Sequence, residues 1–460
     1  MRVRHGCRAG TRWLFTPTHT GDLHPMPQSG LSHVGRAAAL FRKTLSAAAL
    51  DEIARGCRFV QRQRTVTACS VFWALMTTLG AHRTQYISDV LRSLNAQQGW
   101  SVRYKPFWDR LAKRAFSIFM KTLFERLCRE MTMRVLGAQA GSVASCFSDI
   151  LMDDGSSFAI ADGLRNVFPG RFTTATPAAV ELHVHMSLMS GNVRHVTLAA
   201  DKEAERQFLP PASSLPPRSL SLRDRGYVDL DYFEALAERR AYLICRAPNA
   251  LNPTIVGVLS GLPKRLSKKW VGQQLQQLRK KKLRHDLDLL VSWPRKGGTT
   301  LELRLCIRYI PGKKSWTWLL TNLPKTFAAS SVGRLYRLRW QIELLFKDWK
   351  SYANLHALQT EHPAIVEGFI WASLCAAFLK RALAHWAQLV SEGRAISTRI
   401  AAQAGAQILP LLALFAARGF RVARLSEILQ FLVNNAVRPH PERGKRGHAH
   451  ALGLRDLVMA

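Results

Sequence analysis

The sequence holds few acidic residues. Its 460 residues include 31 Asp and Glu against 66 Lys and Arg, which gives a formal net charge of +35 at pH 7. A positive field of this size attracts polyanions, and each phosphate that a Lys or Arg neutralises releases counterions into solution. Ribosomal proteins and membrane-surface proteins are also this basic, so the charge favours a nucleic-acid partner but does not by itself select one.

Several motifs with a known chemistry are missing. The chain has no G-x-S-x-G nucleophile motif and no Walker A phosphate-binding loop, and no Cys and His arrangement predicts nucleophilic catalysis. Its 8 cysteines are scattered without any C-x-x-C pair. We therefore expect reduced cysteines in the core of a cytosolic protein and no zinc site.

The sequence also gives little sign of a membrane partner. The first residues are basic but lack the apolar segment of a signal peptide. The most apolar helical stretch, residues 368–379, is too short to span a bilayer. These features predict a cytoplasmic protein, and a content of 47% hydrophobic residues is enough for the cores of two to four domains.

The hydrophobic patterns of the N-terminal part are helical. Residues 1–35 show no periodicity and are expected to form a basic, disordered tail, whereas residues 36–145 are expected to form a helical domain. Within it, the segments 86–94 and 104–112 are joined by a short link that contains Gly99. They fit a DNA-binding helix-turn-helix and an ordinary helical bundle equally well.

From residue 146 the pattern changes to short apolar runs that alternate with one helix. Over residues 146–247 the order is three strands, helix, strand, helix, strand, which predicts an α/β sheet. The first strand ends at Asp153–Asp154–Gly155, and a later strand, 220–223, is followed by Asp224. Strand ends hold side chains on a rigid backbone, although Asp–Gly and Asp–Arg–Gly are also common turn sequences.

Residues 248–325 interrupt this α/β region. They begin with a basic stretch, residues 264–284, that has nine Lys or Arg and no acidic residue. Strand-like runs follow, so we expect a basic, β-rich insertion. Residues 326–365 then carry a long helix at 331–350, and residues 366–460 are expected to form a helical C-terminal region with a basic tail.

The helix expected at 331–350 has two distinct stripes at about 100° per residue. The apolar core stripe consists of Leu338, Ile342, Leu345 and Trp349. A neighbouring stripe carries Tyr336, Arg339, Glu343 and Lys350. A carboxylate there can bind a divalent cation while its basic neighbours bind phosphates, but an exposed salt bridge between Arg339 and Glu343 explains that pair as well.

Asp154, Asp224 and Glu343 together would supply three oxygen ligands. Carboxylates of this kind suit Mg²⁺ or Mn²⁺. Two such ions about 4 Å apart would activate a water or a 3′-hydroxyl and stabilise the leaving oxygen, which is phosphodiester chemistry.

Here the chain resembles a known family. The series Tyr336-x2-Arg339-x3-Glu343-x6-Lys350 matches the YREK signature of the DDE transposases of the IS-four insertion-sequence family. Residues 154–158 and 224–227 resemble the blocks around that family's first and second aspartates, and residues 168–171 resemble a further block. The resemblance spans about residues 40 to 370. It implies an α/β, ribonuclease-H-like core with a mostly β insertion, flanked by helical N- and C-terminal regions.

The resemblance also implies roles for individual residues. Asp154, Asp224 and Glu343 would be catalytic and would bind two Mg²⁺ ions, for which Mn²⁺ can substitute. Because Asp154 has the Gly155–Ser156 context of the family, it is preferred over Asp153 as the ligand. The residues expected to contact the transposon-end DNA are Tyr336, Arg339, Lys350, Lys347 and Arg225.

Tryptophans near this helix are similar in position to family residues that stack on a flipped base. They are Trp340 and one of Trp316 or Trp318. Stacking on an aromatic face is physically reasonable for an extruded base. Positions in a hydrophobic core explain the two strand tryptophans as well.

The resemblance implies a bacterial, nucleoid-associated transposase. It would bind terminal inverted repeats through residues 36–145 and the insertion, act as a homodimer, cut each end and join the 3′-hydroxyls to target DNA. A catalytically inactive or domesticated DNA-binding descendant is the first alternative, and an intact carboxylate trio argues against it. A ribonuclease-H-fold nuclease unconnected with transposition is the second.

Overall fold

The computed structural model describes most of the chain. It covers residues 28–62, 65–81, 86–131, 136–138, 141–248, 250–280, 284–295, 298–310, 312, 314–353, 355, 358, 360–391, 393–437 and 457–459. Residues 1–27 and the basic tail at 438–450 therefore lie outside the described part. Helix α1 begins at Gln28, so the prediction of a disordered segment up to residue 35 is wrong for residues 28–35.

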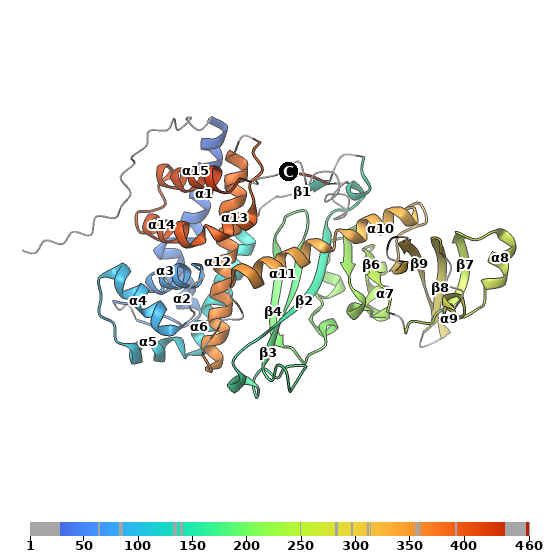
Figure 1. Ribbon diagram of the computed structural model, residues 1–460, viewed down its shortest axis with the longest axis horizontal. Coiled ribbons are helices and arrows are strands. Elements are labelled where there is room, and N and C mark those ends of the chain that lie inside the picture. Colours follow the sequence, from blue (N-terminus) through green and yellow to red (C-terminus); the bar gives the residue numbers. More distant parts are fainter. Residues whose placement is uncertain are drawn as a thin grey trace, which may run out of the picture.

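Helices from both ends of the sequence form one lobe (Figure 1). The N-terminal helices are α1 (Gln28–Leu45), α2 (Ala47–Gly56), α3 (Ala68–Leu79), α4 (Ile87–Gln98), α5 (Tyr104–Leu111) and α6 (Arg114–Glu130). The C-terminal helices are α12 (Pro363–Val390), α13 (Thr398–Gln403), α14 (Gly405–Ala417) and α15 (Val422–Asn435). They share one hydrophobic core, in which α12 contacts α1, α3, α6 and α15.

Helix α12 is longer than the sequence suggested. With 28 residues it is long and apolar enough to cross a membrane, so the prediction that this stretch is too short is wrong. However, 78% of its most apolar window is buried inside the molecule. Its close packing is visible at Gly368, where a Cβ atom would overlap the Phe116 ring. We conclude that α12 is the central helix of the lobe's core.

A single sheet runs from the helical lobe to the far end of the molecule. Its order is β4-β3-β2-β5-β6-β10-β9-β8-β7. The first five strands are β2 (Ile150–Ala159), β3 (Ala179–Ser187), β4 (Val193–Ala200), β5 (Leu220–Arg223) and β6 (Tyr242–Arg246). Strands β2, β5 and β6 are parallel, and α7 (Leu230–Glu238) connects β5 to β6. The predicted α/β class is confirmed.

The segment after β6 extends this sheet. Its strands are β7 (Thr254–Ser260), β8 (Leu287–Pro294), β9 (Thr300–Ile310) and β10 (Ser315–Thr321), with α8 (Lys264–Trp270) and α9 (Leu275–Arg279) between β7 and β8. Strand β10 pairs with β6 in antiparallel register, from Leu319 opposite Arg246 to Thr321 opposite Ile244. The three strand-like runs expected after residue 286 are therefore present. A separate small pair joins β1 (Leu136–Ala138) and β11 (Leu457–Met459).

The long helix expected at 331–350 is broken. It consists of α10 (Ala329–Arg337) and α11 (Trp340–Tyr352), so the prediction of one straight helix is wrong. At the break the backbone forms tighter i to i−3 hydrogen bonds, from Arg339 N to Tyr336 O (3.1 Å) and from Gln341 N to Leu338 O (3.0 Å). The predicted core stripe is nevertheless buried, because Leu338 and Ile342 at the break are both fully enclosed.

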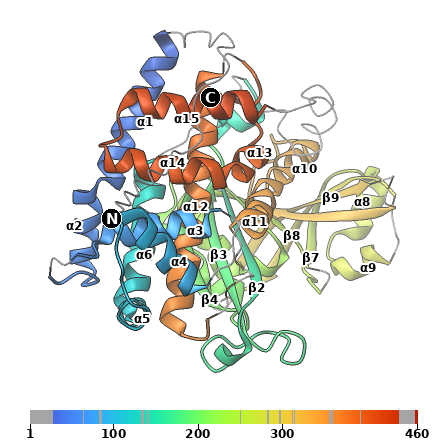
Figure 2. The ribbon, with the colours of Figure 1, turned by 60° about the vertical axis from the view of Figure 1, so that its left-hand side comes forward.

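Two further predictions near the sheet need correction. The first strand was expected to end at residue 152, but β2 continues through Asp154 to Ala159 in a ten-residue pairing with β3. Asp154 therefore lies within a strand and not in a turn. The helix expected between the third and fourth strands is only a short 3-10 turn, Glu205–Phe208. Helix α11 lies against β2, as two views of the molecule show (Figures 1 and 2).

Candidate active site

The helix α11 and the strand β2 bring two of the predicted carboxylates to the same guanidinium group. Arg339 Nη1 donates to Asp154 Oδ2 at 2.7 Å, and Arg339 Nη2 donates to Glu343 Oε1 at 3.0 Å. Both Arg339 and Asp154 have side chains that are only 13% exposed, whereas Glu343 is 38% exposed. Asp154 and Glu343, 189 positions apart in the sequence, are thus separated by one guanidinium.

The third predicted carboxylate lies on the neighbouring strand. Parallel pairing places Asp153 opposite Arg223, so Asp154 and Asp224 are the next positions of β2 and of the chain after β5. The Tyr336 hydroxyl donates to Asp224 Oδ1 at 3.2 Å, and Arg246 Nη1 lies 3.9 Å from the same oxygen. The structure therefore brings Asp154, Asp224 and Glu343 together around Tyr336 and Arg339.

Asp153, the alternative to Asp154, points away from this group. Its carboxylate accepts from Arg223 Nε at 2.9 Å and lies 2.7 Å from His185 Nδ1 in a fully buried cluster. Burial raises the pKa of Asp153, but the charges of Arg223 and His185 outweigh burial and bring the pKa down to about 2. Asp153 is thus held in a structural ion pair, which leaves Asp154 as the aspartate that faces α11.

The environment of Asp154 disfavours its negative charge. Burial raises the pKa of Asp154 to about 7, although Arg339 lowers it, and the charges of Glu343 and Glu205 raise it further. A carboxyl group with a raised pKa in a cluster of like charges is often found at functional sites. A divalent cation bound there would relieve this repulsion.

Two glutamates that the sequence did not predict lie behind the aspartates. A Cβ atom on Gly155 would overlap Glu181 Oε1, and a Cβ atom on Gly226 would overlap Glu205 Oε2. Burial, aided by the charge of Glu205, raises the pKa of Glu181 to about 7, and burial also raises the pKa of Glu205. The glycines that follow Asp154 and Asp224 leave space for these carboxylates, and no pattern in the sequence indicated this.

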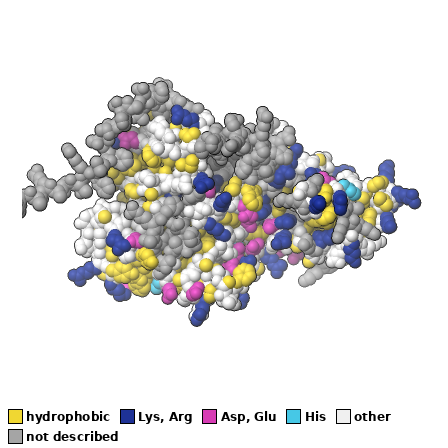
Figure 3. All heavy atoms as spheres, viewed as in Figure 1, with side chains coloured by type: hydrophobic (Ala, Val, Ile, Leu, Met, Phe, Trp, Pro, Cys, Tyr) yellow, Lys and Arg dark blue, Asp and Glu magenta, His cyan; other side chains and the backbone are white. Residues whose placement is uncertain are grey.

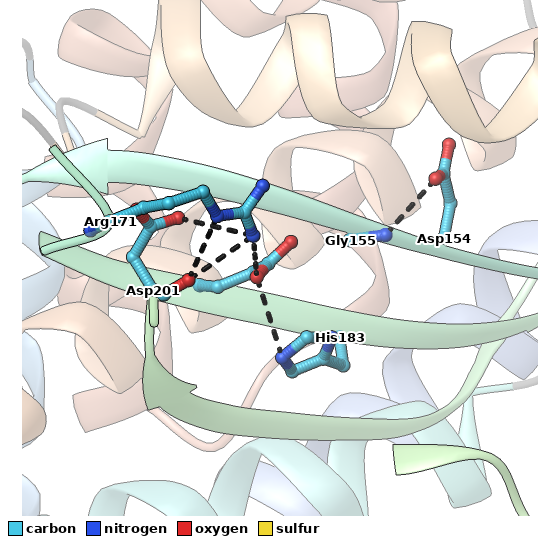
Figure 4. A network of polar contacts seen from close by, with 6 residues as sticks. Asp154, Gly155, Arg171, His183 and Asp201 are labelled. Carbon is cyan, nitrogen blue, oxygen red and sulfur yellow. Dashed lines mark hydrogen bonds and ion pairs between the residues drawn. The ribbon is translucent and has the colours of Figure 1, made fainter. Parts of the chain in front are cut away.

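Arg171 links the acidic layer formed by Glu181 and Glu205 to the sheet (Figure 4). Its backbone N donates to Asp201 Oδ2 at 2.9 Å, and its guanidinium donates to Asp201 O at 3.2 Å and to Glu181 Oε2 at 3.3 Å. His183, buried beside Glu181, stacks on Phe208 with ring centroids 3.9 Å apart. Arg171 belongs to the 168–171 block noted in the sequence, and this block was the only part of the sequence that pointed to the acidic layer.

The donor atoms at this site suit a hard cation, but their present arrangement does not form a cage for one. Within the residues that the structure describes, no three His, Cys, Asp or Glu side chains are positioned to hold a single metal ion. The cause is visible at Arg339, whose guanidinium lies between Asp154 and Glu343. The oxygen-only donor set of Asp154, Asp224 and Glu343 nevertheless suits a divalent ion.

Basic residues surround the acidic centre, which consists of Asp154, Asp224 and Glu343. Lys347, Lys350 and Arg225 are exposed, and acidic side chains gather near the middle of the molecule with Lys and Arg on either side (Figure 3). Trp340, next to Arg339, is 49% exposed. Trp316 and Trp318 instead line a small cavity in the sheet extension, where Arg279 lies over the Trp318 ring at 4.5 Å from its centroid. The DNA-contacting roles given to these residues remain predictions.

Comparison with known proteins gives this site a family. The family model described as a transposase DDE domain matches residues 154–379, from the first aspartate to α12. The chain is 23% identical over 372 residues to the transposase of insertion sequence IS231B from Bacillus thuringiensis subsp. berliner, covering 72% of this chain and 76% of the relative. It is 24% identical over 380 residues to the IS231C transposase, covering 73% and 77%.

A third relative matches a shorter segment more closely. The putative transposase InsL of IS186A from Escherichia coli strain K12 is 50% identical over 62 residues, which cover 13% of this chain and 17% of the relative. The α/β core, the facing carboxylates and these matches define a DDE transposase with a ribonuclease-H-like fold. Within that class, the chain is similar to transposases of insertion sequences over about 72% of its length. Domains of this class generally act with divalent metal ions.

Proposed function

We propose that this transposase cuts DNA at the terminal inverted repeats of its element and joins the resulting 3′-hydroxyls to target DNA. The observation that carries the proposal is the shared contact of Arg339 with Asp154 and Glu343, beside the contact of Tyr336 with Asp224. Three carboxylates from distant parts of the chain have little reason to meet, against their own repulsion, unless a cation joins them.

Asp154, Asp224 and Glu343 would hold two Mg²⁺ ions, for which Mn²⁺ can substitute. Such ions supply an activated water or 3′-hydroxyl and stabilise the leaving oxygen. The chain's own residues position the DNA strand. Lys347 and Lys350, one turn and two turns beyond Glu343, are exposed on α11, and Arg225 is exposed directly after Asp224. They would bind the phosphates on either side of the cut.

Arg339 and Tyr336 would have two alternating partners. Arg339 neutralises Asp154 and Glu343, and Tyr336 donates to Asp224. When cations neutralise the carboxylates, both side chains become available to donate to a phosphate. Trp340, exposed beside Arg339, would then stack on an unpaired base at the cut.

Other parts of the chain would provide DNA recognition and assembly. We assign end binding to residues 36–145 and to the basic stretch of 248–325, catalysis to 146–247 and 326–365, and dimer formation to 366–460. In this assignment the protein acts as a homodimer on the bacterial nucleoid. The charge of +35 supports a duplex DNA partner.

The decisive experiment compares cleavage with binding. The wild type, Glu343→Gln and Glu427→Gln would each be given Mg²⁺ and a duplex that carries the inverted repeat bordering the gene. We expect Glu343→Gln to lose cleavage by at least about 10³-fold while its affinity for the duplex stays within a few-fold. Glu427, an exposed residue that pairs with Arg424 on α15, is the control and should cut normally. Normal cutting by Glu343→Gln would refute the assignment.

Two alternatives give different results. A catalytically inactive or domesticated descendant would bind the repeat but would not cut it with any divalent metal. A nuclease of the same fold unconnected with transposition would cut duplexes without preference for the repeat and would not join ends to a target plasmid. The contacts of Arg339 with both Asp154 and Glu343 favour the active enzyme, because a pure DNA-binding protein does not need these carboxylates to meet.

A further inference from the structure

The loop between β2 and β3, residues 160–178, exposes an aromatic side chain close to the acidic centre. Phe172 is 66% exposed, which is more than any other large hydrophobic residue in the described part of the chain. Val167, in the same loop, is 51% exposed. The loop nevertheless has a packed base, because its Leu164 and Phe168 are buried. Phe172 and Val167 are thus two exposed apolar side chains on a loop whose base is packed.

The loop is held in a fixed shape. Gly170 N donates to Pro177 O at 2.9 Å, and Thr176 N donates to Phe172 O at 2.8 Å. The two arms are so close that a Cβ atom on Gly170 would overlap Thr176 O. Arg171 then ties the tip to Asp201 and Glu181, as Figure 4 shows. Because its neighbour is fixed in this way, Phe172 projects from a rigid base.

The loop lies near the catalytic strand. Glu181, which Arg171 contacts, pairs with Ser157, three positions along β2 from Asp154. At about 3.3 Å per residue, the anchor of Phe172 is roughly 10 Å from the position of Asp154 along the strand. The loop carries Arg165 and Arg171 against one acidic residue, Asp162. A DNA strand in the site therefore passes within reach of this loop.

The other side of the loop reaches the helical lobe. A Cβ atom on Gly163 would lie 2.6 Å from Glu361 Cδ, and the next residue, His362, stacks edge-on against Trp108 of α5 at 5.3 Å between ring centroids. Helix α5 also exposes Tyr104 and carries Lys105. The loop thus lies between the α4–α5 helix pair and the catalytic strand.

We propose that Phe172 is a DNA wedge, inserted between base pairs of the transposon end while the helical lobe and the catalytic site hold the duplex on either side. This inference rests on the proposed function. Apolar side chains on rigid supports unstack base steps in this way and bend the duplex. A bend between the two protein surfaces would bring the end of the repeat onto Asp154, Asp224 and Glu343.

The test measures base unstacking separately from cutting. A duplex that carries the bordering inverted repeat is prepared with 2-aminopurine at successive positions and is bound by the full-length protein in EDTA, where no cleavage occurs. We expect fluorescence to rise at one step of the duplex with the wild type and with Phe172→Trp. With Phe172→Ala we expect the rise to be lost and cleavage in Mg²⁺ to fall by about tenfold. Val167→Ala, altered in the same loop, is the matched control and should behave as the wild type.

Each result has a defined meaning. An unchanged fluorescence rise with Phe172→Ala overturns the wedge. A loss of dimer in place of a loss of unstacking, measured by sedimentation, overturns it as well and identifies Phe172 as a contact between copies of the chain. If the wild type cuts the repeat but unstacks no base, only the wedge fails. If the wild type neither binds nor cuts the repeat, the proposed function fails with it.

Discussion

Arg339 and Asp154 form an ion pair across 185 positions of sequence, with Nη1 of the arginine 2.7 Å from Oδ2 of the aspartate. Both side chains are largely withdrawn from solvent. Burial raises the pKa of Asp154 and Arg339 lowers it, so the arginine partly offsets the cost of this buried carboxyl group. The guanidinium thus neutralises part of the negative charge of both Asp154 and Glu343.

Removal of Arg339 should separate metal binding from catalysis. In Arg339→Ala, no internal cation competes for Asp154 and Glu343, so we expect Mn²⁺ to bind about tenfold more tightly in calorimetric titration. Cleavage should still fall by about 10²-fold, because a phosphate donor is lost. Arg424→Ala, which breaks an exposed pair on α15, should change neither quantity. Weaker Mn²⁺ binding by Arg339→Ala would show that the arginine supports the metal site and does not compete with it.

The adjacent aspartates should respond to pH in opposite ways. The pKa of Asp153 is about 2 in the folded protein, below its ordinary value of 3.8. Its carboxylate therefore stabilises the fold above about pH 4, and this contribution is lost as the pH falls toward 2. Asp153→Asn should lower the free energy of unfolding by about 3 kcal/mol at pH 7, with a difference that shrinks in acid.

The ionisation of Asp154 should have the opposite effect on stability. The pKa of Asp154 is raised from 3.8 to about 7, so the folded protein binds this proton more strongly than the unfolded chain does, and stability should fall as the pH rises from about 3.8 to 7. Asp154→Asn should therefore unfold at the same or higher urea concentration than the wild type at pH 8, although it should not cut DNA. A strong destabilisation by Asp154→Asn at pH 8 would contradict the stated environment of this carboxyl group.

Gly155, directly after Asp154, should be intolerant of a methyl group. In Gly155→Ala the new Cβ overlaps Glu181 Oε1, so Glu181 must move and disturb the acidic layer behind Asp154. We expect cleavage to fall by about tenfold with a small loss of stability. The double variant Gly155→Ala with Glu181→Asp should restore part of the activity, because the shorter Asp side chain leaves room for the new methyl group. Gly35→Ala, at a position with nothing within 4 Å, is the control.

A buried lysine in α12 should make stability depend on alkaline pH. Lys380 is 2% exposed and lines a cavity of about 30 Å³ with Asp348 and Arg381. Burial lowers the pKa of Lys380 to about 7, so the unfolded chain binds its proton more strongly than the folded protein does. Stability should therefore rise as the pH increases from about 7 to 10.5.

The variant Lys380→Met should remove this dependence. We expect it to be about 3 kcal/mol more stable than the wild type at pH 6, because the charge of Lys380 is then no longer buried. Thermal unfolding monitored by circular dichroism between pH 6 and pH 10 checks both statements. Parallel stability curves for the two proteins over this range would show that Lys380 keeps its ordinary pKa in the fold.

Those parts of the site that depend on local periodicity could be predicted from the sequence. The apolar stripe through Ile342 requires a helix with one buried face, which turns Glu343 toward the sheet. Asp224 follows a short buried strand, and parallel strands end at one edge. Each of these patterns spans only a few residues. The resemblance to a family was what indicated that the carboxylates belong to one site.

Other parts depend on contacts between distant segments. Asp154 lies within β2 because β3 pairs with the strand for five residues beyond it, and no local signal separates this from an Asp–Gly turn. The break between α10 and α11 follows from packing, since no Pro or Gly marks it. Glu205 and Glu181 join the site only through the space at Gly226 and Gly155, which the fold alone reveals.

The hydrogen bonding between β6 and β10 places the basic segment and Asp224 on one sheet. Leu319 pairs with Arg246, and Ala247 N donates to Trp318 O at 2.8 Å, so the strands that carry α8 and α9 continue the ladder that holds β6. Arg246, at this junction, lies 3.9 Å from Asp224 Oδ1. Under the proposed function, DNA bound by the basic segment and DNA at Asp224 would therefore contact the same hydrogen-bonded framework.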